Sequence, residues 1–328
     1  MLMSSRRGFA GRHPSCYSPG GSPWDAYRCD YRMGDTLPMI ALGLAIAFLF
    51  VLFLRWKARY RYPPRDVPQI LCYHKLSSKF CFEGTWMPPA RFLRQIDRLA
   101  GEGFEFIGED SFLEALDGLL PRRDTELLLT FDDGYDELYD MCLDHLIPRD
   151  IPVLIFLPTE YVGKENAWDL SLGRRPFTHL SCPRIEELAK HGVRFGSHGA
   201  RHLDLTNLNE KELEREVAGS KKALQEITGA QVKTFAYPFG RYDVRIKSAV
   251  QQAGYQAAFS LYPGHSNEVT DRFALRRNGV YIIDTPLTVR CKLRPNPLYW
   301  FEEMKCRAIN GVALLTPVLK RFSAGPGK

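Results

Sequence analysis

The amino-acid sequence predicts an α/β protein, a closed or nearly closed (β/α) barrel of about seven parallel strands preceded by one transmembrane helix. Short apolar runs rich in β-forming residues alternate with helical patterns from Gln69 onward. Most of these runs lack a strict polar and apolar alternation, which is typical of parallel strands buried on both faces. A single uncharged apolar segment precedes them, over residues 37–54.

Composition supports a folded chain and narrows its partners. With 328 residues and 45% hydrophobic content, the chain can build a sizeable core, which excludes disorder as its main state. The net charge of +6 is unevenly placed. Residues 1–65 hold ten basic and three acidic residues, which leaves 34 basic against 35 acidic over residues 66–328. A nearly neutral folded part argues against a nucleic-acid partner, because nucleic-acid-binding domains carry clustered positive charge.

The first 66 residues divide into three predicted segments. Residues 1–36 are rich in Gly, Ser, Pro and Arg without periodicity, which indicates a disordered leader. Residues 37–54 have about the length that a helix needs to cross a bilayer. The alternatives are a buried core helix or a cleaved signal peptide, but the run lacks a polar face and no small-residue cleavage motif follows it. Residues 55–66 form a basic juxtamembrane linker.

Charges flanking the apolar segment predict its orientation. Residues 55–65 carry five basic and no acidic residues, whereas two arginines on the other flank are opposed by two aspartates. Because Lys and Arg near a span favour the cytoplasmic side, we expect a single-pass protein of a bacterial inner membrane with its catalytic part on the cytoplasmic face. Eight cysteines without a C-x-x-C pattern favour the same compartment.

The predicted barrel elements follow in order. Strands are expected over 69–74, 127–133, 152–158, 193–198, 233–238, 255–261 and 273–280. Helices are expected over Pro89–Ala100, Ser111–Leu119, Glu137–Leu146, Arg184–His191, Asn209–Ile227 and Val244–Ala253. The helix that starts at Asn209 has the clearest signals, since Asn209 can cap it, Glu212 completes a capping box and Gly229 ends it. The catalytic domain is predicted over 67–295. The tail over 296–328 is expected to be a helical cap on the barrel, with a membrane-skimming segment as the alternative.

Polar residues cluster at the ends of several predicted strands, where β/α folds place catalytic groups. Asp132 and Asp133 end one strand, and both can face one site only if the chain turns there, which Gly134 permits. His198 and His202 end another, and two imidazoles with one carboxylate can bind a metal and leave positions open for water and substrate. Taken alone, the aspartates could form a turn or helix cap, and the histidines could be ordinary ones. Their occurrence at strand ends of one β/α chain favours a metal site.

At these residues the sequence resembles the polysaccharide deacetylase family, also called carbohydrate esterase family 4 or the nodulation-protein-B homology domain. The motifs TFDDG, SHGARH and YPFG carry the resemblance, which covers roughly Val67 to Ile283. It implies a distorted (β/α) barrel. It also implies that Asp132 is the catalytic base, that a metal-bound water is the nucleophile, and that a divalent metal, with zinc expected, has three protein ligands. Those ligands are Asp133, His198 and His202.

The YPFG turn and the departures from the family pattern supply further candidates. By resemblance, the Phe239 backbone N–H stabilises the oxyanion, and Tyr237 and Pro238 contact substrate; an ordinary strand-to-helix turn is the alternative. Many members have an arginine that orients the base where this chain has Ala236. We therefore expect the base to be tuned by another group.

The general acid of the family has no clear match in this sequence. His74 and His265 are the candidates, and the alternatives are a core-edge histidine and a surface-loop histidine. Arg276 could approach the site from the end of a predicted strand and is therefore a candidate for substrate binding. The alternative is a surface ion pair.

These features together predict a metal-dependent N-deacetylase. Its expected substrate is an N-acetylated amino sugar in a polysaccharide or a lipid-linked saccharide at the membrane. A deformylase or another amide hydrolase acting on a glycolipid would use the same metal and base. A catalytically silent carbohydrate-binding protein is the alternative from another class, although the retained Asp132 argues against it because binding alone needs no base.

Overall fold

The computed structural model describes residues 33–59, 67–79, 81, 84–121, 123–168, 177–261, 271–294, 296 and 298–313. The chain divides into two compact units, Met1–Arg59 and Tyr60–Lys328. Residues 1–32 of the leader predicted over 1–36, and residues 60–66 of the linker predicted over 55–66, lie outside the described residues.

The described part of the first unit is one helix, α1 (Met33–Arg59), which contains the whole predicted span and its flanking residues. Its charged residues lie toward the ends, with Asp35 in the first turn and Arg55 near the last.

Among the described residues, no helix has both the length and the apolar character that are needed to cross a membrane. This finding contradicts the transmembrane helix predicted over 37–54. It also contradicts the single-pass membrane localisation, with its cytoplasmic orientation, that rested on that helix.

The second unit is built on a nine-stranded sheet in the described residues, and all its pairings are parallel. The strand order is β10-β9-β8-β7-β6-β5-β1-β11, with β4 paired to the first half of β5. The strands are β1 (Gln69–Tyr73), β4 (Glu105–Ile107), β5 (Glu126–Phe131), β6 (Leu154–Leu157), β7 (Arg194–Ser197), β8 (Thr234–Ala236), β9 (Ala257–Ser260), β10 (Leu275–Arg276) and β11 (Asn278–Gly279). A second small sheet pairs β2 (Lys75–Leu76) with β3 (Trp86–Met87).

The barrel closes where its two edge strands meet in the sequence. β10 pairs with β9, β11 pairs with β1, and Arg277 is the single residue between β10 and β11. The run predicted as one strand over 273–280 therefore splits in two and joins both edges of the sheet. The nearly closed parallel barrel predicted from the sequence is confirmed.

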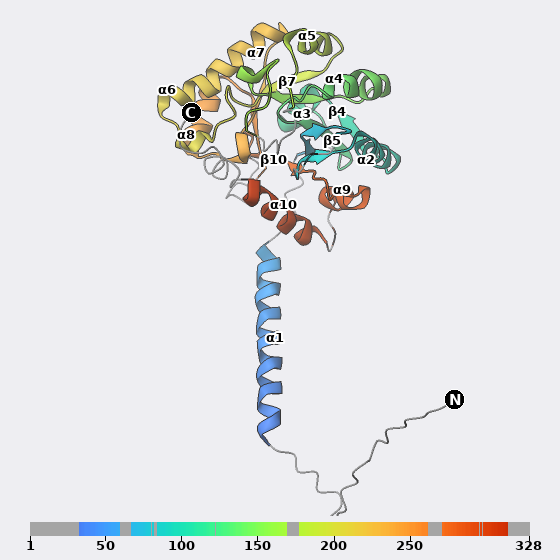
Figure 1. The fold of residues 1–328 in the computed structure, drawn as a ribbon, viewed down its shortest axis with the longest axis vertical. Helices are drawn as coiled ribbons and strands as arrows, with labels where there is room; N and C mark the ends of the chain where they lie inside the picture. Colours follow the sequence, from blue (N-terminus) through green and yellow to red (C-terminus); the bar gives the residue numbers. More distant parts are fainter. Residues whose placement is uncertain are drawn as a thin grey trace, which may run out of the picture. The chain divides into compact units, whose positions relative to one another are not determined.

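Helices surround the barrel strands (Figure 1). The α-helices of this unit are α2 (Pro89–Gly101), α3 (Glu109–Leu116), α4 (Leu138–Met141), α5 (Cys182–Lys190), α6 (Glu210–Glu214), α7 (Ser220–Thr228), α8 (Val244–Gln252), α9 (Pro286–Leu293) and α10 (Tyr299–Ala313). Two π-helical turns are η2 (Cys142–Leu146) and η6 (Arg215–Gly219). Short 3₁₀ turns are η3 (Ile147–Arg149), η4 (Thr159–Tyr161), η5 (Leu205–Asn207) and η7 (Pro238–Gly240).

Local signals explain the clearest helix. The Asn209 side chain accepts a hydrogen bond from the Glu212 backbone N–H, and the Glu212 side chain accepts one from the Asn209 N–H, which completes the predicted capping box. Gly229 adopts a left-handed conformation with φ of 65° and ends α7. The helix predicted over Asn209–Ile227 is thus observed as α6, η6 and α7 in succession.

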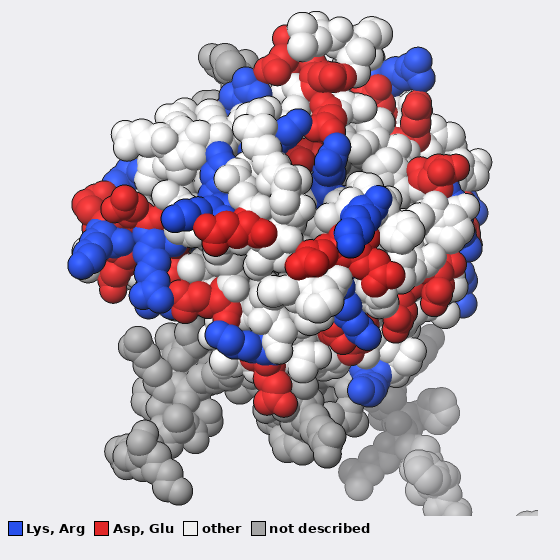
Figure 2. All heavy atoms as spheres, turned by 90° about the horizontal axis from the view of Figure 1, so that it is seen from above, with Lys and Arg blue, Asp and Glu red and all other residues white. Residues whose placement is uncertain are grey.

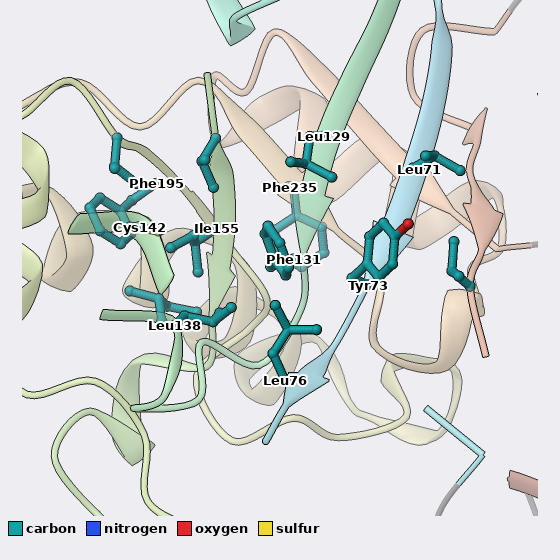
Figure 3. Packing of buried hydrophobic residues seen from close by; sticks show 14 of the residues in the cluster. Leu71, Tyr73, Leu76, Leu129, Phe131, Leu138, Cys142, Ile155, Phe195 and Phe235 are labelled. Atoms are coloured by element: carbon teal, nitrogen blue, oxygen red, sulfur yellow. The ribbon is translucent and has the colours of Figure 1, made fainter. Parts of the chain in front are cut away.

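Alternation along the strands produces two apolar clusters. Leu71 and Tyr73 of β1 and Leu129 and Phe131 of β5 face the surrounding helices and pack with Ile155, as Figure 3 shows. Residues of the opposite parity line the barrel interior, where the cluster contains Ile70, Leu128, Leu154, Phe156, Ala236, Ala257, Phe259 and Leu275 and is completed by Phe112 and Leu113 of α3. The same parity sends Thr130 and Asp132 toward the interior, so the core pattern fixes where the first polar group after β5 points.

The C-terminal helices α9 and α10 are attached through buried charges. Lys292 Nζ lies 2.5 Å from Asp284 Oδ2, and Lys305 Nζ lies 2.6 Å from Asp284 Oδ1. Described residues of the predicted tail thus form a helix, α10, while residues 314–328 lie outside the described part. On the surface, acidic and basic side chains are interspersed over the face in Figure 2.

Candidate active site

Two aspartates reach one site because the chain turns sharply after β5. Asp133 has a φ of 67° and Gly134 a φ of 60°, so two consecutive residues adopt the left-handed region. A side chain on Gly134 would collide with Leu157, since its Cβ would lie 1.9 Å from the Leu157 Cδ2. The turn that was predicted at Gly134 therefore already begins at Asp133. It places the Asp133 side chain near that of Asp132.

Two histidines lie opposite this turn. His198 follows β7 directly, and its Nδ1 donates a hydrogen bond to the Ala236 carbonyl at 2.8 Å. That bond leaves Nε2 as the atom with a free lone pair, 3.8 Å from Asp133 Oδ1. His202 Nε2 lies 3.5 Å from the same oxygen. The loop between the histidines turns through positive φ values at Gly199, 78°, and at His202 itself, 54°.

Asp133, His198 and His202 form a group with the chemistry of a metal site. Their potential ligand atoms all lie within 4.8 Å of one another. Burial lowers the pKa of His198, and burial together with the neighbouring His198 holds the pKa of His202 well below its usual range. Neutral imidazoles and a carboxylate fit a divalent transition metal such as zinc.

Asp132 is buried beside this group and is held by a second arginine of the LRRN segment, which sequence reasoning missed. Arg277 donates two hydrogen bonds to it, NH1 to Oδ1 at 2.6 Å and NH2 to Oδ2 at 2.7 Å. Burial raises the pKa of Asp132, but the Arg277 charge and the hydrogen bonds of its guanidinium outweigh burial and hold this pKa well below its usual range. Asp132 is therefore a charged carboxylate inside the barrel.

Arg277 occupies the role that we expected another group to take. Ala236 is fully buried in the barrel interior and offers no charge. The guanidinium of Arg277 instead enters from the seam between β10 and β11, against the rings of Phe156 and Phe259. Asp132 is thus oriented by a residue from the seam between β10 and β11 and not by one from β8.

Arg276, the predicted substrate-binding residue, is the last residue of β10, immediately before Arg277. Its guanidinium pairs with Glu303 of α10, and these two side chains are only 18% and 3% exposed. Neighbouring residues of an extended chain point to opposite faces, so only one of the two arginines can reach the interior. The structure therefore places Arg276 outside the site in an ion pair, as in the alternative, but this pair is mostly buried and does not lie on the surface.

His74 follows the last residue of β1 and lies beside Asp132. Its Nε2 lies 3.8 Å from Asp132 Oδ2, and its side chain is 15% exposed against 2% for that of Asp132. Cys72, two residues earlier, directs its thiol to the same oxygen at 3.4 Å. His74, Cys72 and Asp132 form a second group of close polar side chains.

The YPFG turn lines the site only in part. Phe239 has a φ of 59° and its ring centroid lies 4.7 Å from that of His202. Pro238 is buried next to the histidine loop, where a Cβ on Gly199 would lie 3.7 Å from its Cγ. Tyr237, in contrast, is fully buried and donates its hydroxyl to the Phe273 carbonyl, so its side chain is unavailable to a substrate. His265 lies outside the described residues.

Two aromatic residues that sequence reasoning missed also support the group. His179 Nδ1 donates to the Asp133 carbonyl at 2.7 Å, and Trp168 stacks on the His202 ring with centroids 4.4 Å apart. Neither belongs to a strand-end motif, so no spacing signal marks them in the sequence.

Comparison with known proteins agrees with this geometry. Residues 120–258 match the model of the polysaccharide deacetylase family. This part of the chain is a polysaccharide deacetylase domain, and the prediction of a glycan N-deacetylase is confirmed at that level. His74 and Arg277 lie outside the matched residues but in the same barrel.

Curated relatives cover more of the chain. YxkH of Bacillus subtilis is 29% identical over 218 residues, which are 65% of this chain and 71% of that protein. The poly-beta-1,6-N-acetyl-D-glucosamine N-deacetylase of Staphylococcus aureus is 26% identical over 182 residues. That match is 52% of this chain and spans 60% of the staphylococcal protein, less than two thirds of its length.

A solved structure shares the fold. The Streptococcus pyogenes deacetylase PplD, solved in complex with acetate, superposes with a TM-score of 0.60 at 20% identity. The superposition covers 70% of this chain and 99% of that one.

Proposed function

We propose that this protein is a metal-dependent hydrolase that removes an N-acetyl group from an amino sugar in a glycan polymer. The observation that carries the proposal is the Asp132–Arg277 pair beside the Asp133, His198 and His202 group. One buried carboxylate is kept charged next to three residues suited to a cation, a pairing that can support metal-assisted hydrolysis of an amide. The staphylococcal relative, named for poly-beta-1,6-N-acetyl-D-glucosamine, supports a polymer of this sugar. A lipid-linked saccharide of the same sugar is the second substrate to test.

Asp133, His198 and His202 would hold the divalent cation, with zinc as the expected ion. When bound, such an ion supplies Lewis-acid polarisation of a carbonyl and lowers the pKa of a bound water toward ~7. The donor set fits zinc because both imidazoles are neutral and His198 has its tautomer fixed by the Ala236 carbonyl.

Asp132 would act as the base that accepts a proton from the attacking water. Its Oδ2 is the oxygen that faces both His198, at 3.9 Å, and His74, at 3.8 Å. Arg277 holds the carboxylate from behind, so the oxygen keeps one orientation and is charged before it accepts the proton. The base would therefore be positioned before substrate arrives.

His74 would deliver a proton to the leaving amine. It lies on the same side of Asp132 as the metal group, and its partial exposure gives the ring access to substrate that buried Asp132 lacks. The backbone N–H of Phe239 would stabilise the oxyanion, since the ring of that residue contacts His202. The catalytic domain is proposed to extend over 67–295.

The test is acetate release from N-acetylated β-1,6-linked glucosamine oligomers by the zinc-loaded protein, with a lipid-linked N-acetylamino sugar assayed in parallel. Asp132→Asn should lower the rate by about 10²- to 10⁴-fold, the range of a lost general base. A chelator should abolish the rate and zinc should restore it.

Asp140→Asn is the matched control, because Asp140 is an exposed carboxylate on α4 and its variant should release acetate like the wild type. Equal rates for the wild type and Asp132→Asn would refute the proposal. Release of formate alone, from an N-formyl analogue, would replace it with a deformylase.

A further inference from the structure

A fully buried carboxylate lies beneath the histidine loop. Glu216 has 0% relative exposure and belongs to the π-helical turn η6 between α6 and α7. Burying a charge is costly unless hydrogen bonds and opposite charges compensate it, so the partners of this carboxylate indicate its task. π-Helical turns also occur frequently at functional sites.

All the hydrogen-bond donors described for this carboxylate come from the loop between the two histidines. Oε2 accepts from the backbone N–H of Ala200 at 2.8 Å and of Arg201 at 2.9 Å. Oε1 accepts from the Arg201 Nε at 2.7 Å. One side chain thus binds the loop between His198 and His202 through both oxygens.

The next turn of the same helix holds the loop at its other end. Ser220 and Ser197 share a hydrogen bond between hydroxyls at 2.6 Å. The Ser197 hydroxyl also accepts from the Gly199 N–H at 3.2 Å. The segment from Glu216 to Ser220 therefore contacts the chain on both sides of His198.

The loop conformation needs such support. Gly199 and His202 both have positive φ, and a positive φ at a histidine persists only when surrounding contacts enforce it. Gly199 also makes room for the carboxylate, because a Cβ there would lie 3.0 Å from Glu216 Oε2. The loop between His198 and His202 therefore leaves room for the Glu216 carboxylate, which in turn binds that loop.

We propose that Glu216 is a positioning residue of the metal centre. Its hydrogen bonds to Ala200 and Arg201 hold the loop so that both imidazoles face Asp133, and this arrangement sets the affinity for a divalent cation. The inference rests on the proposed function, since it requires that Asp133, His198 and His202 bind the cation.

The experiment measures the dissociation constant for zinc in the full-length protein by competition with a chromogenic chelator. Glu216→Gln keeps the shape of the side chain but places an amide NH₂ against the loop N–H groups. We expect it to weaken zinc binding by about 10- to 100-fold, as loss of an outer-shell partner typically does. Circular dichroism and thermal melting of the metal-free protein show whether the variant is folded.

Glu109→Gln is the matched control. Glu109 is almost as buried, 3% exposed, but it bonds to Thr234 at the first residue of β8, away from the histidine loop. Its variant should bind zinc as the wild type does. Equal loss of affinity in both variants would show a general effect of a lost buried carboxylate and overturn the inference.

The outcomes separate this inference from the proposed function. A folded wild type that binds no zinc refutes the metal proposal itself. A wild type and a folded Glu216→Gln that bind zinc equally well refute only the role of Glu216. If Glu216→Gln does not fold, Arg201→Met decides: it removes one of the three hydrogen bonds, and unchanged zinc affinity would overturn the inference, whereas weaker binding would support it.

Discussion

The two ends of the barrel treat buried carboxylates in opposite ways. At the carboxyl ends of the strands, Asp132 is 1% exposed and accepts two hydrogen bonds from Arg277. At the amino ends, Glu109 is 3% exposed and accepts one hydrogen bond from the Thr234 hydroxyl, at 2.6 Å. The pKa of Asp132 lies well below its usual range, whereas burial raises the pKa of Glu109 from 4.5 to about 7.

Asp132 and Glu109 are almost equally buried, so their different pKa values follow from the groups that bond to each carboxylate. A guanidinium with two hydrogen bonds overcomes the cost of burying Asp132, and a single hydroxyl does not overcome it for Glu109. Glu216, at the catalytic end, is likewise matched by three donors. The cost of burying a carboxylate is thus offset at Asp132, where the proposed reaction needs a charged group. At Glu109, at the other end of the barrel, it is offset only in part.

The largest expected effect follows from removing Arg277. Arg277→Met leaves Asp132 buried without its counter-ion, and breaking a buried ion pair costs about 3–5 kcal/mol of stability. The pKa of Asp132 should rise, because burial then acts with less opposition. We expect kcat/KM for acetate release to fall about 100-fold or more, with the acidic limb of the pH profile moved to higher pH. Steady-state kinetics over pH 4–9 and chemical unfolding measure both changes.

Arg276→Met is the matched control, since it also breaks an ion pair, with Glu303, but outside the site. It should lower stability and leave the acidic limb of the pH profile in place. Superimposable pH profiles for Arg277→Met and the wild type would show that the pair with Asp132 does not tune the base.

A smaller effect should appear at the amino end of the barrel. Folded Glu109 keeps its proton up to about pH 7, whereas in the unfolded chain it loses that proton near pH 4.5. The folded state therefore binds more protons between these values, and stability falls as pH rises through this window. Glu109→Gln removes this dependence. Between pH 5 and pH 8, the free energy of unfolding should fall by about 2 to 3 kcal/mol more in the wild type than in the variant.

Urea unfolding at the two pH values measures this difference. Asp140→Asn is the control, because Asp140 is an exposed carboxylate on α4, whereas Glu109 belongs to α3. Its variant should keep the wild-type difference between pH 5 and pH 8. A wild-type difference in Glu109→Gln would mean that Glu109 is already charged at pH 5.

Sequence patterns predicted the barrel and its polar strand ends well, because both depend on local signals. Apolar runs located every strand of the main sheet except β4, with β10 and β11 predicted as one strand, and the residues after β5 and β7 brought Asp132, Asp133, His198 and His202 together. Asp132 and His198 follow a buried strand directly, so the place of each is fixed by the strand before it, and Asp133 and His202 lie in the turns that follow.

Groups that arrive from distant segments could not be predicted in this way. Choosing Arg277 over Arg276 required knowing which of the two points into the barrel at the seam, where β10 and β11 have two residues each. Glu216 lies in the middle of a predicted helix, and only its contact with the histidine loop distinguishes it. The apolar run over 37–54 was interpreted as a membrane span from its length and its lack of charge, and the described helix does not support that interpretation.

The smallest effect on activity is expected from replacing Cys72, whose thiol also contacts Asp132. Its thiol lies 3.4 Å from Oδ2, and burial raises the pKa of Cys72, so the group is a neutral and weak donor. Arg277 already gives the same carboxylate two charge-assisted hydrogen bonds, which are about twice as strong as neutral ones. Cys72→Ala should therefore change kcat/KM by less than about threefold and cost about 1 kcal/mol of stability. A loss of activity as large as that of Arg277→Met, measured in the same assay, would contradict this ranking and place the thiol among the groups on which the charge of Asp132 depends.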